Sequence, residues 1–103
     1  MQAINQNINT QTLQAMAKKY IWWQTPVEAA TWPERVIAQV MNIGDFDDAK
    51  YLIESVGGEA LIETLKSAQA GWFNERSWHY WHYRLQLCKL GEVPALPARR
   101  FSA

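Results

Sequence analysis

Hydrophobic side chains recur every three or four residues along most of the chain, which is the spacing of an amphipathic helix. The first such stretch predicts a helix from about Thr10 to Ile21, with an apolar face formed by Leu13, Met16, Ala17, Tyr20 and Ile21. Residues 1–9 are rich in Asn and Gln and are expected to form a disordered leader. No segment shows a competing β-strand pattern, so the fold is expected to be all-α.

Proline and capping residues predict where the next helices begin. Thr25-Pro26-Val27-Glu28 combines an N-cap threonine, a proline at the first helical position and a capping-box glutamate, which indicates a short helical turn. Trp32-Pro33 then ends that turn and starts a longer helix, because proline disfavours a helical residue before it but suits the first turn. This helix is expected to run to Ile43, with Gly44 as the left-handed residue beyond its end.

Three further helices follow from the same signals. Either Asp45 or Asp47 can cap a helix that runs to Val56, where Gly57 and Gly58 end it. The next helix is expected over residues 59–69. Either Asn74 or Ser77 can cap the last helix, which is predicted to reach Leu87. Gly91, Pro94 and Pro97 then predict an extended tail over residues 91–103.

These elements define a single helical domain over residues 10–90, since 103 residues is a usual size for one domain. Short turns between helices of about ten residues favour a small orthogonal array of about five helices over a long up-down bundle. The aromatic helix of residues 74–87 is expected to lie at the centre of this array or to close it. Residues 47–56 and 59–69 also have the layout of a helix-turn-helix, but Glu59 and Glu63 would face DNA phosphates unfavourably.

The aromatic helix has three faces when its residues are placed at 100° intervals. The apolar face carries Trp78, Trp81, Leu85 and Cys88, and a polar strip carries Glu75, His79, His82 and Gln86. The third face carries Tyr80, Tyr83, Arg84 and Leu87. Tyrosine and arginine contribute strongly to protein interfaces, so Tyr80, Tyr83 and Arg84 are candidate partner-binding residues, although a core role for the aromatic rings is equally compatible.

The polar strip suggests a second kind of site. A carboxylate and two imidazoles on one helical face, at Glu75, His79 and His82, could bind a divalent metal or transfer protons. The spacing is compatible with such a site without being diagnostic, and no second cluster of ligands accompanies it. We therefore expect no cofactor and identify no catalytic residues.

Charge is distributed unevenly although the net charge is zero. Residues 28–63 contain eight carboxylates against two basic side chains, whereas residues 64–103 contain six basic side chains against two carboxylates. The two halves could attract one another, or the basic end could bind an anionic partner. The amino terminus lacks a signal-peptide pattern, and Cys88 is the single cysteine, so a cytoplasmic location without membrane attachment is expected.

The chain resembles a family of small uncharacterised bacterial all-helical proteins over about residues 18–100. The resemblance lies in Tyr20-Ile-Trp-Trp, in Trp32-Pro-Glu-Arg-Val-Ile-Ala-Gln-Val-Met-Asn-Ile-Gly-Asp and in the closing Ser77-Trp-His-Tyr-Trp-His-Tyr-Arg. Some relatives are encoded beside nucleotidyltransferase-type toxins of abortive-infection systems. The resemblance therefore implies an antitoxin or accessory role, and it implies no catalytic residues.

Three functional hypotheses remain open. The preferred one is an interaction module without enzymatic activity that binds a protein, such as a neighbouring toxin-like protein or a second copy of itself. Its candidate contacts are Tyr80, Tyr83, Arg84, Arg99, Arg100 and Phe101. The second hypothesis is nucleic-acid binding through the basic, aromatic C-terminal third. The third is a metal-dependent enzyme that uses Glu75, His79 and His82.

Overall fold

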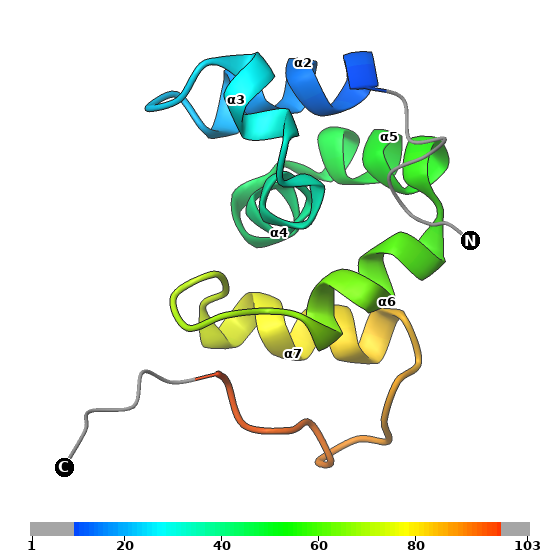
Figure 1. The fold of residues 1–103 in the computed structure, drawn as a ribbon. Helices are drawn as coiled ribbons and strands as arrows, with labels where there is room; N and C mark the ends of the chain where they lie inside the picture. Colours follow the sequence, from blue (N-terminus) through cyan, green and yellow to red (C-terminus); the bar gives the residue numbers. More distant parts are fainter. Residues whose placement is uncertain (1–9, 98–103) are drawn as a thin grey trace, which may run out of the picture.

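The computed structural model describes residues 10–97, and this part of the chain contains six helices and no strand. The helices are α2 (Thr10–Tyr20), α3 (Pro26–Ala30), α4 (Pro33–Ile43), α5 (Phe46–Val56), α6 (Gly58–Lys66) and α7 (Glu75–Arg84) (Figure 1). The expected all-α fold is confirmed. The predicted leader, residues 1–9, and the last six residues of the predicted tail lie outside the described residues.

Helix α4 lies at the centre of the molecule and packs against each of the other five helices in this range. Its Val36, Ile37 and Val40 are completely buried. Figure 1 views α4 nearly along its axis, whereas α2, α5 and α7 run across the view, so the helices form the expected array of crossing rather than parallel axes. The aromatic helix α7 closes one side of this array, and the central position belongs to α4.

The core is continuous through the array because each helix contributes its apolar face. The large buried side chains are Leu13, Met16, Tyr20, Ile21, Val36, Ile37, Val40, Met41, Leu52, Leu61, Leu65, Trp72, Phe73, Trp78 and Trp81. Beyond α7, Val93 and Leu96 pack against this core, so the segment that follows α7 returns to the domain surface.

Local capping contacts explain where the helices begin. Thr25 and Glu28 form both hydrogen bonds of the expected capping box at α3. Asp45 is the residue that caps α5, since its carboxylate accepts a hydrogen bond from the Asp48 amide. Asn74 caps α7 in the same way by accepting from the Ser77 amide. For both α5 and α7 the sequence allowed two N-cap residues, and in each case the structure uses the one nearer the amino terminus.

Two helices end earlier than the sequence pattern predicted. Helix α6 stops at Lys66 rather than residue 69, where the Ser67 hydroxyl donates to the Glu63 carbonyl and competes with continuation of the helix. Helix α7 stops at Arg84 rather than Leu87. The Leu87 amide donates to the His82 carbonyl and the Gln86 amide to the Tyr83 carbonyl, which is the Schellman arrangement. The helix predicted over residues 85–87 is therefore wrong, and the helical face assigned to Cys88 is wrong with it.

The prediction for Gly44 is also wrong. Gly44 has φ −69° and ψ 153°, an extended conformation open to any residue, and not the left-handed one. A steric restriction explains why glycine occupies this position. A Cβ here would overlap the Val40 carbonyl oxygen and lie 2.9 Å from Val40 Cγ1. Separately, no helix within residues 10–97 is long and apolar enough to cross a bilayer.

Candidate partner-binding groove

Two buried tryptophans fix α7 to its neighbours and so decide which of its faces is exposed. The indole nitrogen of Trp81 donates to the Met41 carbonyl at the end of α4, at 2.8 Å. The indole nitrogen of Trp78 donates to the Pro94 carbonyl in the segment after α7, also at 2.8 Å. Both rings are nearly fully buried, so their polar atoms need these partners. Helix α7 is thereby held between α4 and the returning chain.

The structure does not bring Glu75, His79 and His82 together as a metal site. His82 is buried, with its ring centroid 4.4 Å from that of Trp78 and its Nδ1 donating to the Trp78 carbonyl at 2.7 Å. His79 is half-buried, and its Nδ1 donates to the Glu75 carbonyl. No group of three or more potential metal-ligating side chains occurs within residues 10–97. His82 was assigned to the polar strip, yet it lies only 40° around the helix from Trp78 and belongs to the buried face.

The third face of α7 is exposed and borders a groove. Arg76, Tyr80 and Arg84 follow one another at four-residue spacing along this face, and Phe46 at the start of α5 lies across from them. Phe46 is 68% exposed and Tyr80 47% exposed. A hollow of about 260 Å³ lies where α4 ends, α5 begins and α7 passes, and it includes all four residues in its lining.

A shallower hollow of about 540 Å³ adjoins the first one and shares Phe46, Tyr80 and Arg84 with it. Tyr83 completes the lining of this second hollow. We call the combined surface of Phe46, Arg76, Tyr80, Tyr83 and Arg84 the Phe46–Tyr80 groove. It brings together the three α7 residues that the sequence named as candidate contacts. Arg99, Arg100 and Phe101, the other candidates, lie outside the described residues.

Contacts within the groove hold Arg84 in place. Its guanidinium donates to the Tyr80 hydroxyl at 2.7 Å. The guanidinium carbon lies 5.4 Å from the centroid of the Trp81 ring and 5.9 Å from that of Tyr80, within cation–π range. Neither Arg84 nor Arg76 forms an ion pair with any carboxylate of residues 10–97. The groove therefore presents two positive charges that the described chain does not neutralise.

Tyr83 has a structural role beside its place in the groove. Its hydroxyl accepts a hydrogen bond from the Gly91 amide at 3.0 Å, which ties the segment after α7 to the helix. The ring itself is only half-buried and its edge remains in the groove lining. Removal of the whole side chain would thus disturb both the groove and the returning chain.

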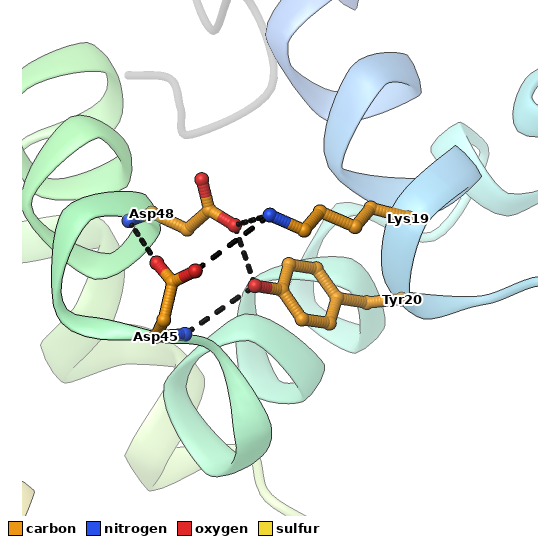
Figure 2. A network of polar contacts seen from close by, with 4 residues as sticks. All are labelled: Lys19, Tyr20, Asp45 and Asp48. Carbon is orange, nitrogen blue, oxygen red and sulfur yellow. Dashed lines mark hydrogen bonds and ion pairs between the residues drawn. The ribbon is translucent and has the colours of Figure 1, made fainter.

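A polar network fixes the start of α5, the helix whose first residue is Phe46, and Figure 2 shows the four residues that form it. The Asp48 carboxylate accepts hydrogen bonds from Lys19 Nζ at 2.6 Å and from the Tyr20 hydroxyl at 2.5 Å. The same hydroxyl accepts from the Asp45 amide at 3.3 Å, and Lys19 Nζ lies 3.7 Å from the Asp45 carboxylate. These contacts join the end of α2 to the residue that precedes Phe46.

The same contacts shift the pKa values of Lys19, Tyr20 and Asp48. Hydrogen bonding from Lys19, and then from Tyr20, lowers the pKa of Asp48 below its ordinary value of 3.8. The hydrogen bond to Asp48 raises the pKa of Lys19 above 10.5. Burial, and then donation to Asp48, raises the pKa of Tyr20 above 10.0. The charged carboxylate, the ammonium and the neutral phenol are therefore the stable forms around neutral pH.

Phe46 and Arg76 are the groove residues that were not among the candidate contacts predicted from the sequence, and Phe46 is the one that lies outside α7. A phenylalanine in the first turn of a helix can turn toward the core or toward solvent, and its spacing from Ala49 and Ile53 places it at the edge of the apolar face. Only the position of α7 beside α5 makes it part of a binding surface.

A second aromatic surface lies at the connection between α2 and α3. Trp22 is 79% exposed, Trp23 is 51% exposed, and their rings meet edge to face with centroids 5.5 Å apart. Trp32 is also exposed on one side, whereas its other side meets Trp72. Half of the six tryptophans are thus buried and half are exposed.

Comparisons of the chain with protein-family models, with curated proteins and with solved structures found no match. The geometry of the Phe46–Tyr80 groove is therefore the basis for inferring function.

Proposed function

We propose that this protein is an interaction module that binds a protein partner through the Phe46–Tyr80 groove. The observation that carries the proposal is that the exposed rings of Phe46 in α5 and Tyr80 in α7 line the same hollow. Aromatic rings and arginines in concave, partly apolar surfaces supply most of the binding energy at protein interfaces. The groove combines both residue types on helices whose apolar faces are packed in the core, so we expect little backbone freedom to be lost on binding.

The partner in this proposal is a cytoplasmic bacterial protein, and the family resemblance favours a toxin-like protein encoded nearby. An antitoxin or accessory protein acts by occupying a surface of its partner, which requires a stable interface and no catalytic chemistry. Arg99, Arg100 and Phe101 would add contacts at the end of the chain.

Nucleic-acid binding is the second candidate, because Arg76 and Arg84 lie on either side of Tyr80 and a base could stack on that ring. Arg76 and Arg84 are the only basic side chains among the described residues that line the two hollows, however, whereas a nucleic-acid backbone is usually bound by a row of Lys and Arg side chains along its phosphates. A protein segment with a few charges fits this lining better than a nucleic-acid backbone does. A binding constant that falls steeply with salt concentration would favour nucleic acid.

The proposal is tested by co-purification of the full chain with the protein products of the genes that neighbour its own. Replacing Phe46 and Tyr80 together with alanine should weaken capture at least about a hundredfold, as expected for central aromatic contacts. The matched control replaces Trp22 and Trp23 with alanine, which removes two exposed rings away from the groove. Equal capture by the groove variant and the wild type, with unfolding temperatures unchanged, would contradict the proposal.

Tyr83 needs its own variant because of its hydrogen bond to the Gly91 amide. Tyr83→Phe keeps the ring in the groove and removes only that bond. Weakened capture by Tyr83→Ala but not by Tyr83→Phe would assign the effect to the ring rather than to the returning chain.

A further inference from the structure

We infer that the Phe46–Tyr80 groove selects an acidic segment in which a bulky apolar side chain lies between two carboxylates. This inference rests on the proposed function and adds the chemistry of the partner. The groove has an apolar centre, formed by the rings of Phe46 and Tyr80. Arg76 and Arg84 lie on α7, one on each side of Tyr80 along the helix.

The two arginines set the spacing of the carboxylates. Arg76 and Arg84 are separated by two turns of α7, which places their Cα atoms about 12 Å apart at 1.5 Å per residue. Tyr80 lies midway between them on the same face. In an extended peptide at about 3.3 Å per residue, carboxylates four positions apart span about 13 Å, and the side chain between them would meet Tyr80.

Arg84 is already oriented for a carboxylate. Its hydrogen bond to the Tyr80 hydroxyl and its position over the rings of Tyr80 and Trp81 restrict its movement without neutralising its charge. A guanidinium has five N–H donors, so the bond to Tyr80 leaves others for a bidentate contact with a carboxylate. Because Arg84 is already held by these contacts, it would lose less conformational entropy on binding than an unrestrained exposed arginine does.

Arg76 also favours an incoming carboxylate. It lies in the first turn of α7, where the positive end of the helix dipole disfavours a cation and favours an anion. The structure gives Arg76 no hydrogen bond or ion pair with any residue between 10 and 97, so its donors remain for a partner.

The acidic residue at the rim does not cancel this preference. Asp45 lines the groove, but its carboxylate accepts from the Asp48 amide and lies 3.7 Å from Lys19 Nζ. Its charge is therefore partly balanced inside the chain, whereas no carboxylate of residues 10–97 forms an ion pair with either arginine. The net preference of the groove is for negative charge at its ends and apolar surface at its centre.

The test is selection from a displayed library of random peptides of about twelve residues, long enough to span the groove, against the immobilised full chain. Enriched peptides are then synthesised with a fluorescent label, and their affinity is measured by fluorescence anisotropy. We expect enriched sequences to carry Asp or Glu four positions apart around a Leu, Phe or Trp. Arg76→Gln and Arg84→Gln should each weaken binding about tenfold, because each removes a charge-assisted contact. Lys66→Gln, the same loss of charge at an exposed position of α6 outside the groove, should leave binding unchanged.

The outcomes separate the inference from the proposed function. Enriched peptides that lack carboxylates but lose binding on Phe46→Ala would overturn the inference and leave the proposed function standing. Enrichment of no peptide whose binding depends on Phe46 or Tyr80 would overturn both. Competition for the groove by a single-stranded thymidine oligonucleotide, stronger than by any selected peptide, would assign the groove to nucleic acid.

Discussion

Gly44 and Gln86 show, at the scale of single residues, that backbone conformation and residue type need not correspond at helix ends. Gly44 follows α4 with a φ of −69°, which any residue can adopt. Gln86 follows α7 with a φ of 59°, a left-handed conformation that favours glycine. The environment decides both cases: Val40 leaves no room for a Cβ at position 44, and the Schellman hydrogen bonds hold Gln86.

Gly44→Ala should lower the free energy of unfolding by about 1–3 kcal/mol, because the new Cβ must displace Val40 backbone and side-chain atoms. Gly58→Ala is the matched control, since a Cβ there has open space and the position opens α6. It should be neutral or stabilising by up to about 1 kcal/mol. Urea denaturation of both variants measures the difference, and equal stability would contradict the steric explanation for Gly44.

Gln86→Gly should raise the free energy of unfolding by about 0.5–1 kcal/mol. The change relieves the left-handed strain of a residue with a Cβ, which exceeds the entropy that glycine adds to the unfolded chain. Thermal denaturation followed by circular dichroism checks this, with Gln69→Gly, in the connection before α7, as the control for glycine substitution alone. A destabilised Gln86→Gly variant would show that the glutamine side chain has a role of its own.

At the scale of elements, the junction between α2 and α5 depends on the ionisation of one carboxylate. Asp48 accepts from both Lys19 and Tyr20, and these bonds hold the helix start that bears Phe46 (Figure 2). Because its pKa is lower in the folded chain than its ordinary value of 3.8, the folded state binds this proton more weakly than the unfolded state. The stabilisation is therefore present above about pH 4 and is lost as pH falls through the folded-state pKa.

Asp48→Asn should consequently reduce stability at neutral pH, and the gap to the wild type should close below about pH 4. Asp47→Asn on the same helix turn is the control, since no ion pair or hydrogen bond joins the Asp47 side chain to the rest of residues 10–97. Urea denaturation across the acidic range measures both. A gap that stays constant with pH would show that the Asp48 charge does not matter to the junction.

At the scale of the whole molecule, α4 organises the fold because it contacts all the other helices of the described chain. Its central amides can exchange with solvent only when the array opens, so those of Val40 and Met41 should be among the slowest in hydrogen exchange. Amides of residues 85–97 should exchange much faster, since that segment has no helix. Slower exchange in α7 than in α4 would contradict the central role of α4.

Much of the fold follows from local pattern. The apolar spacing of residues 33–43, the capping box at Thr25 and the prolines at positions 26 and 33 each predict a helix or its first residue, and the structure agrees. These signals depend on residues within one or two helical turns of each other, so they can be recognised from the sequence alone. Helix ends were less predictable, because the stops at Lys66 and Arg84 depend on specific hydrogen bonds rather than on residue type.

The Phe46–Tyr80 groove shows what local sequence pattern cannot predict. Sequence alone determined an all-α chain with an aromatic last helix, and it predicted Tyr80, Tyr83 and Arg84 as candidate contacts on one face of that helix. Tertiary structure decided that His82 is buried against Trp78, that Phe46 joins Tyr80, and that three tryptophans remain exposed. The physical reason is that helical periodicity identifies which residues share a face, whereas burial depends on which other helix covers that face.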